Sequence, residues 1–135
     1  MKIKAELKRR LEAFLDEWML REQEMGGFLL KSRRGIVSEF LPIPNVSEKP
    51  RTTYRMPPKS KDLAEQLARS RRMTVEAHFH SHPDPCIMSA ADQCYAEATD
   101  LTCVAITPTG QWRRGRREYL WYACQGIKPV KIEEV

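Results

Sequence analysis

The sequence lacks any long apolar run. None of its 135 residues belongs to a hydrophobic stretch near the ~20 residues that a membrane-spanning helix needs. The N-terminal segment is charged and amphipathic, and it has no apolar core of the kind that signal peptides carry. We therefore expect a protein without membrane association that resides in the cytoplasm.

Cysteine motifs are also absent. The four cysteines form no Cys-x-x-Cys pair, which argues against a cysteine-based zinc finger and against a thioredoxin-like redox motif. A disulfide framework is not expected without a secretory context. We predict buried free thiols that behave as small hydrophobes. Cys86 is kept apart as a candidate ligand or redox group, because it lies in the loop beside the histidine motif described below.

Nucleic-acid recognition motifs are missing too, although the formal net charge is +5. The densest basic run is RRGRR at residues 113–117, which we predict to be a hairpin tip around Gly115. Such a tip is either a solvated loop or a basic surface that steers an acidic protein partner. Nucleic acid is not the expected partner, because no aromatic residue interrupts the run itself.

The composition is that of one ordinary globular domain. Hydrophobic residues make up 41% and charged residues 30% of the chain, and 135 residues can bury a single core. The sequence shows no internal repeat and no low-complexity segment. We predict a single domain over residues 1–135.

Hydrophobic periodicity predicts the elements. Spacings of three and four predict a first helix with one apolar stripe, made of Leu7, Leu11, Phe14, Leu15 and Trp18. In a second helix, capped by Ser60, we expect Leu63, Leu67 and several alanines to face the core. The order of elements indicates an α/β fold, a mixed sheet with helices packed on it. The predicted helices are residues 3–22, 60–72 and 89–99, and the predicted strands are 24–31, 36–41, 54–56, 74–80, 101–107, 118–124 and an edge strand at 127–132.

The most informative motif is His80-Ser81-His82-Pro83, followed at short range by Ser89 and Asp92. If the segment before it is a strand, His80 and His82 project to the same face. Ser89 is a candidate helix cap, which places Asp92 in the first turn, where its carboxylate can lean back toward the strand end. Two imidazoles and one carboxylate suit a catalytic zinc, which keeps its fourth position for water. His78 lies on the same strand face and is a further candidate ligand.

These residues resemble the motif of the JAMM (JAB/MPN) zinc metallopeptidases, which is an upstream Glu, then His-x-His-Pro, then Ser-x-x-Asp. Glu24, at the head of a Glu-x-x-Gly strand, matches the upstream Glu. Residues 42–54 resemble the family's Pro-x-Asn-x-Ser passage with its later Pro and aromatic. The interval between Pro83 and Ser89 is one residue shorter than the family usually has, a change that a loop can absorb.

The resemblance implies the MPN fold, related in layout to the cytidine deaminases. It implies about one zinc ion per chain, held by His80, His82 and Asp92. It also implies Glu24 as the general base and Ser89 as a hydroxyl donor to the oxyanion. Because Pro83 directly follows His82, as in the family, we expect His78 to support the site without binding the ion.

The implied substrate is a ubiquitin-like protein or its conjugates, cleaved after the C-terminus in deconjugation or precursor processing. A small prokaryotic member fits the chain length, and a bacterial antiviral conjugation operon is one setting for such enzymes. Two other functions stay open: an MPN interaction scaffold without catalysis, which the shortened interval favours, and a RadC-like protein from DNA-associated contexts. A cytidine deaminase is excluded, because His-x-Glu and Pro-Cys-x-x-Cys are missing. A homodimer is left open.

Overall fold

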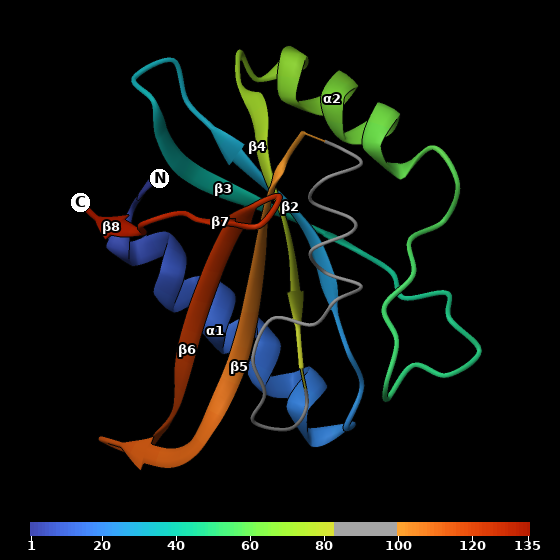
Figure 1. The fold of residues 1–135 in the computed structure, drawn as a ribbon, viewed down its shortest axis with the longest axis vertical. Helices are drawn as coiled ribbons and strands as arrows, with labels where there is room; N and C mark the ends of the chain where they lie inside the picture. The colour runs from blue at the N-terminus through green and yellow to red at the C-terminus, as the bar shows by residue number, and fades with distance from the viewer. Residues whose placement is uncertain (83–99) are drawn as a thin grey trace.

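A computed structural model describes residues 1–82 and 100–135 (Figure 1). The predicted fold class, a mixed sheet with helices packed on it, is confirmed. The elements in chain order are β1 (Lys2–Ile3), α1 (Ala5–Leu20), β2 (Gly26–Lys31), β3 (Ile36–Ile43), α2 (Ser60–Ser70), β4 (Thr74–Ser81), β5 (Thr102–Arg113), β6 (Arg116–Gln125), β7 (Lys128–Pro129) and β8 (Glu133–Glu134).

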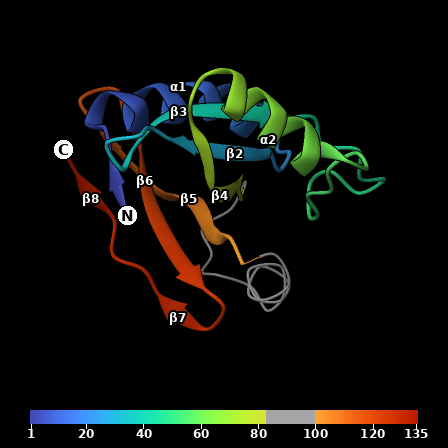
Figure 2. The same cartoon turned by 90° about the horizontal axis from the view of Figure 1, so that it is seen from above.

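The strands form one sheet in the order β7-β6-β5-β4-β2-β3-β1-β8. β4 pairs parallel with β5, and β1 pairs parallel with both β3 and β8. β7 and β8 are the outermost strands, although only residues 130–132 separate them. The four Cα steps from Pro129 to Glu133 span at most about 15 Å. The sheet must therefore curl so that its two edges approach each other, as Figure 2 shows from above.

Helix α1 lies inside this curl. Its Phe14 ring packs against Phe40 of β3, with 5.6 Å between the ring centroids, and its Glu12 Oε1 accepts a 3.0 Å hydrogen bond from Trp121 Nε1 of β6. In a flat sheet, four strand spacings would separate β3 from β6 by about 19 Å. A helix is only ~10–12 Å wide, so the sheet wraps around it. Phe14 and Trp18 of the predicted stripe are only partly buried against the core, whereas Met19 joins the leucines among the buried residues, which are Leu7, Leu11, Leu15 and Met19.

Helix α2 covers the opposite face of the sheet. Its Ala64 and Ala68 are buried in a second apolar cluster with Phe28 and Leu30 of β2. Leu29, between those two strand residues, belongs to the α1 cluster instead. This alternation is the usual consequence of strand geometry, and it defines two faces with separate cores.

Two predictions about α2 are wrong. Lys59, at φ 66°, occupies the N-cap position, and Ser60 is the first helical residue, whose hydroxyl donates a 2.6 Å hydrogen bond to the Pro57 carbonyl. Leu63 is 62% exposed. Because Ala64 and Ala68 face the sheet, the preceding residue is turned by about 100° toward solvent.

Several strand predictions also need correction. The strand expected at residues 54–56 does not form, and the Tyr54 hydroxyl instead donates a 2.7 Å hydrogen bond to the Ile43 carbonyl. The edge strand expected at 127–132 is replaced by β7 and β8 on opposite edges. β5 and β6 are longer than predicted, although the turn at Gly115 is confirmed. The helix expected at 89–99 lies outside the described residues.

Candidate metal centre

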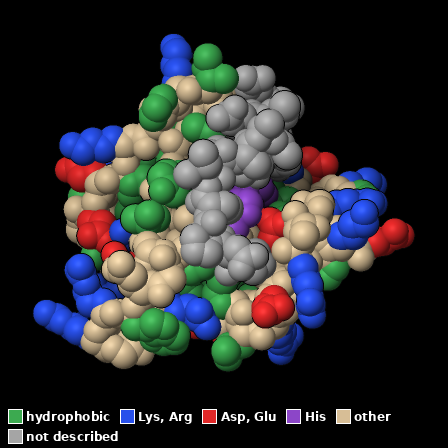
Figure 3. Space-filling model, turned by 60° about the horizontal axis from the view of Figure 1, so that its bottom comes forward, with side chains coloured by type: hydrophobic (Ala, Val, Ile, Leu, Met, Phe, Trp, Pro, Cys, Tyr) green, Lys and Arg blue, Asp and Glu red, His purple; other side chains and the backbone are tan. Residues whose placement is uncertain are grey.

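Strand β4 delivers the histidines to one face of the sheet. Ala77 and Phe79 point into the α1 cluster, so His78 and His80 project from the opposite face. Both are buried, at 6% and 3% exposure. His82 follows the strand and is partly exposed, and Figure 3 shows histidine atoms reaching the surface at this end of the molecule.

Glu24 reaches the histidines through the antiparallel pairing of β2 with β4. Gly26 lies opposite His80 in this register. Just before it, the Ser81 N–H donates to the Met25 carbonyl at 2.6 Å, and the Met25 N–H donates to Ser81 Oγ at 3.0 Å. These reciprocal bonds fix the chain next to Glu24, so a residue remote in sequence lies beside the end of β4.

Gly26 and Gly27 permit this close approach. A Cβ at Gly26 would lie 2.5 Å from the Phe79 carbonyl oxygen and 2.6 Å from the Tyr54 ring. A Cβ at Gly27 would lie 2.0 Å from the Leu41 carbonyl oxygen. Both positions therefore exclude any side chain, and the two glycines let the neighbouring backbones approach closely.

The loop at residues 44–55 holds Glu24 from the other side. Asn45 Nδ2 donates 2.9 Å hydrogen bonds to the carbonyls of Glu24 and Thr53. Its Oδ1 accepts from the backbone N–H groups of Ser47 and Arg55 at 3.0 and 3.1 Å. The Glu24 N–H donates to the loop at the Pro50 carbonyl, at 2.7 Å. Asn45 is thus a positioning residue whose role sequence reasoning did not identify, although its Pro-x-Asn-x-Ser passage was noticed.

Glu24, His80 and His82 come together as one group that could hold a metal ion, with ligand atoms within 4.8 Å of one another. The Nε2 atoms of His80 and His82 are 3.1 Å apart. Glu24 Oε1 lies 3.5 Å from Nδ1 of His82. Two ring nitrogens at this distance either share a proton or direct two lone pairs at a common cation, depending on the tautomers.

A second group shares His80. His78, His80 and Cys103 also place ligand atoms within 4.8 Å of one another, and all three are buried. Cys103 lies opposite His78 in the parallel β4–β5 register, with 3.9 Å between Sγ and Nδ1. The rings of His78 and His80 are stacked, with centroids 5.6 Å apart. Sequence reasoning treated Cys103 only as a small buried hydrophobe, because nothing in the sequence shows which strands pair.

Three of the predicted site residues are therefore brought together, namely Glu24, His80 and His82. Ser89, Asp92 and Cys86 lie outside the described residues. The roles assigned to all of these residues stay predictions. His78 lies beside His80, where we expected a supporting residue, but it also belongs to the second group.

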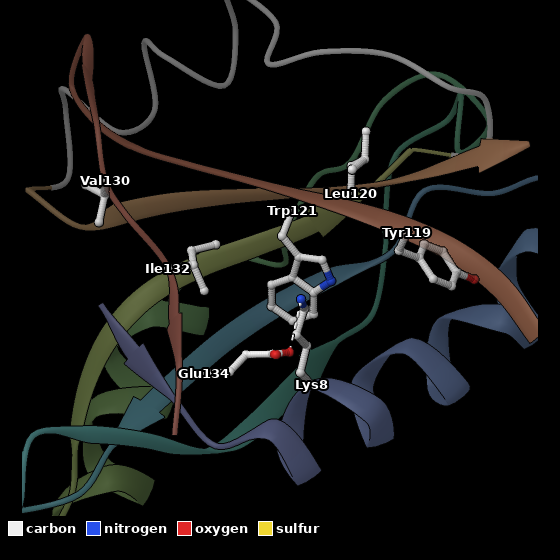
Figure 4. A pocket seen from close by; sticks show the side chains of 7 residues that line it. All are labelled: Lys8, Tyr119, Leu120, Trp121, Val130, Ile132 and Glu134. Atoms are coloured by element: carbon white, nitrogen blue, oxygen red, sulfur yellow. Dashed lines mark ion pairs between the residues drawn. The ribbon is translucent and has the colours of Figure 1, made fainter. Parts of the chain in front are cut away.

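A separate groove of about 410 Å³ lies on the other face of the sheet (Figure 4). Lys8 crosses it, forming a 3.2 Å ion pair with Glu134 and lying 5.5 Å from the centre of the Trp121 ring. Because Trp121 packs on the α1 cluster, the sheet separates this groove from the histidines. Its lining residues are Lys8, Tyr119, Leu120, Trp121, Val130, Ile132 and Glu134.

No helix in residues 1–82 or 100–135 combines the length and the apolar character needed to cross a membrane.

Solved structures resemble this fold over nearly their whole length. A protein from Desulfitobacterium hafniense is 19% identical with a TM-score of 0.71, covering 99% of this chain and 93% of its own. A JAB1/MPN domain protein from Archaeoglobus fulgidus is 20% identical with a TM-score of 0.61, covering 100% and 97%. A protein from Salinibacter ruber is 24% identical with a TM-score of 0.62, covering 100% and 92%.

No family model matches the sequence, and no curated protein matches it. At the identities of the solved structures, the likeness shows the fold alone. The chain has an MPN/JAB-like fold that carries residue groups able to hold a metal ion.

Proposed function

We propose that this protein is a JAMM-type zinc metallopeptidase that hydrolyses a peptide or isopeptide bond after the C-terminus of a ubiquitin-like protein. One observation carries the proposal. On an MPN/JAB-like fold, two histidine Nε2 atoms lie 3.1 Å apart, with the Glu24 carboxylate 3.5 Å from the second ring. These are the residues that the sequence motif singles out.

The donor set fits zinc. Zinc binds imidazole nitrogen at about 2.0–2.1 Å in tetrahedral geometry, which requires two nitrogens roughly 3.3 Å apart. The 3.1 Å between His80 and His82 is close to that requirement. Asp92, outside the described residues, is the third ligand that the motif supplies. A site of two imidazoles and one carboxylate would leave a position for substrate.

A zinc ion bound here would supply Lewis acidity toward a water molecule and a substrate carbonyl. The chain itself would supply the proton transfer. Glu24 Oε1 contacts Nδ1 of His82, the ring nitrogen that does not face His80. The Glu24 carboxylate also lies within 4.8 Å of the ligand atoms of both histidines, and we assign it the role of taking a proton from water and returning it to the leaving nitrogen.

The substrate class rests on the motif resemblance. Deconjugation and precursor processing both require cleavage at the end of an extended tail, and both suit a compact chain that carries the site at one end of its sheet. We extend the proposal to a cytoplasmic bacterial ubiquitin-like modifier, including one encoded in an antiviral conjugation operon.

The alternative is an MPN scaffold without catalysis. It is favoured by the interval between Pro83 and Ser89, which is one residue shorter than the motif usually has. If the loop does not absorb the missing residue, Asp92 is misdirected as a third ligand, and metal binding would be weakened.

The decisive experiment is Glu24→Gln. The variant should fold and keep its zinc, because the swap is nearly isosteric and His80 and His82 are untouched. It should lose ~100–10,000-fold in kcat, since an amide cannot accept the proton. Zinc analysis is done beside cleavage of a ubiquitin-like fusion with a C-terminal extension. Unchanged cleavage would remove Glu24 from the mechanism, loss of zinc would make it a ligand, and an inactive wild type across many fusions would favour the scaffold.

A further inference from the structure

The hairpin of β5 and β6 extends from the sheet as an arm, and we call residues 108–119 the basic arm (Figure 1). Its tip is a two-residue turn in which Arg114 and Gly115 have φ of 53° and 77°, the signs of a type I′ turn. Below the tip, three residues of β5 oppose one of β6, because Pro108 pairs with Tyr119 and Trp112 with Arg117. This bulge bends the hairpin and increases its local twist.

The arm carries a concentration of positive charge. Its four arginines are Arg113, Arg114, Arg116 and Arg117, and the first three are exposed. Within residues 1–82 and 100–135, none of the four forms an ion pair with a carboxylate. Glu118 is the one acidic residue of the arm. No carboxylate of the described residues therefore neutralises the arginines at the arm tip, and their charge would attract an anionic partner.

An exposed aromatic accompanies the charge. Trp112 is 63% exposed, and the Arg117 guanidinium lies 4.9 Å from the centre of its ring. The two residues face each other across the ladder, so the ring is held in place on the arm surface. Tryptophan and arginine are the residue types most enriched among those that dominate protein–protein binding energy.

The arm stands at the same end of the molecule as the candidate metal centre. β5 runs parallel to β4, and the His82 N–H donates to the Ile106 carbonyl at 3.1 Å. From Ile106 the strand continues for seven residues to Arg113, on the order of 20 Å beyond the histidines. A folded protein whose tail entered the site would lie next to this arm.

We propose that the basic arm binds an acidic face of the protein substrate and so selects which protein presents its tail to Glu24, His80 and His82. This inference rests on the proposed peptidase function. A protein face fits better than nucleic acid, because the charge is concentrated at one tip. A bound strand needs a positive track along its backbone. The arginine pair at 33–34 lies at the opposite end of the sheet, since β2 runs antiparallel to β4.

The test compares two variants of equal charge. Arg113→Ser/Arg116→Ser removes two charges from the exposed arm tip. Arg33→Ser/Arg34→Ser removes two from the exposed β2–β3 turn, at the far end. A Trp112→Ala variant separates the aromatic contact from the charge. All five substituted residues are exposed, and circular dichroism with thermal unfolding confirms that each variant folds.

The first measurement is binding of a short polyglutamate peptide at low ionic strength. We expect the arm-tip variant to lose roughly tenfold or more in affinity and the far-end variant to change little, with the difference shrinking as salt is added. Equal losses in both variants would mean a net-charge effect and would overturn the proposal. Displacement of the peptide from the arm by single-stranded DNA at lower concentration would overturn the choice of a protein partner.

The second measurement compares a folded ubiquitin-like fusion with a peptide of its tail alone. The arm-tip variant should raise KM for the fusion roughly tenfold at unchanged kcat, and it should cleave the tail peptide like the wild type. If both double variants cleave the fusion with equal KM, the proposed role of the basic arm is wrong, and the peptidase proposal still stands. If the wild type cleaves neither substrate, the peptidase proposal fails, and polyglutamate binding still decides whether the arm is an acidic-partner surface.

Discussion

His80 is shared by the two groups of residues able to hold a metal ion in the described part of the chain. The groups differ in chemistry. Glu24 and His82 complete a set of nitrogen and oxygen donors, whereas His78 and Cys103 complete a set that includes a sulfur donor. Thiolate favours softer ions than carboxylate does. The spectroscopy of a bound metal therefore reports which group is used.

We expect His82→Ala and Asp92→Ala each to empty the site, because two remaining ligands cannot hold a catalytic zinc. His78→Ala should keep most of its zinc, with at most ~10–100-fold lower affinity, as befits a residue that only orients a ligand. Zinc content of the purified variants is the measurement. A cobalt-substituted wild type should show no thiolate charge-transfer absorption. Such a band, abolished by Cys103→Ser, would assign the ion to the inner group.

At the scale of elements, the loop at residues 44–55 acts as a clamp on the start of β2. Asn45 bridges Glu24, Thr53 and the two loop N–H groups within one side chain. The Gly26–Gly27 pair provides the space on the other side, where no Cβ fits. Glu24 is thus held by contacts to its backbone, which leaves its carboxylate oriented toward His82.

Asn45→Ala should lower the free energy of unfolding by about 1–3 kcal/mol, because backbone groups lose their partners. If the peptidase proposal holds, it should also lower kcat by tenfold or more at unchanged zinc content, since a small displacement of the base is costly. Chemical denaturation and cleavage kinetics measure the two effects. Asn45→Asp is the comparison variant, because it keeps both acceptor contacts and loses the donation to the carbonyls of Glu24, Pro50 and Thr53. Full activity in both variants would contradict the clamp.

At the scale of the whole molecule, polar contacts join α1 to the far side of the curled sheet. The Tyr119 hydroxyl donates to Asp16, and Trp121 Nε1 donates to Glu12 Oε1 at 3.0 Å. Burial raises the pKa of Glu12, an effect that exceeds the lowering by the Trp121 hydrogen bond and by Lys8. Burial likewise raises the pKa of the Tyr119 phenol. These groups are partly desolvated because the sheet wraps around the helix.

Glu12→Gln should stabilise the protein at neutral pH. A carboxyl whose pKa is raised on folding carries no penalty below its unfolded pKa, and it destabilises the fold increasingly as pH rises through the folded value. Because Glu12 is only half-buried, solvent screens the effect, and we expect a gain of about 1 kcal/mol or less. Glutamine can still accept from Trp121. The difference in unfolding free energy between variant and wild type should therefore grow from near pH 4 to pH 7. A difference independent of pH, or one that shrinks, would contradict this assignment.

The parts of the fold that sequence could predict are those set by local periodicity. The four-residue spacing of Leu7, Leu11 and Leu15 fixes which face of α1 is buried. The alternation in β4 places His78 and His80 on one face. The motif resemblance pointed to Glu24, whose carboxylate lies 3.5 Å from the His82 ring.

The parts that sequence could not predict depend on which segments pair. Cys103 lies next to His78 only because β4 and β5 are parallel neighbours. Leu63 faces solvent because α2 packs on the sheet through its alanines. Hydrophobic periodicity alone favours the leucine as the buried residue and so predicts the wrong face. The bulge in the basic arm arises because three residues of β5 lie opposite one residue of β6. The sequence hints at it only through Gly110, which has a positive φ.

The wrapping of the sheet around α1 has a consequence for synthesis. The ribosome makes the helix before every strand that covers it except β1. About 100 further residues must be made after the stripe from Leu7 to Met19 before Trp121 of β6 has emerged. At ~5–20 residues per second this synthesis takes roughly 5–20 s. During that interval the nascent chain presents an amphipathic helix with only an incomplete sheet to cover it. Chaperones that bind such helices should therefore engage this protein early, while its first twenty residues are in the open.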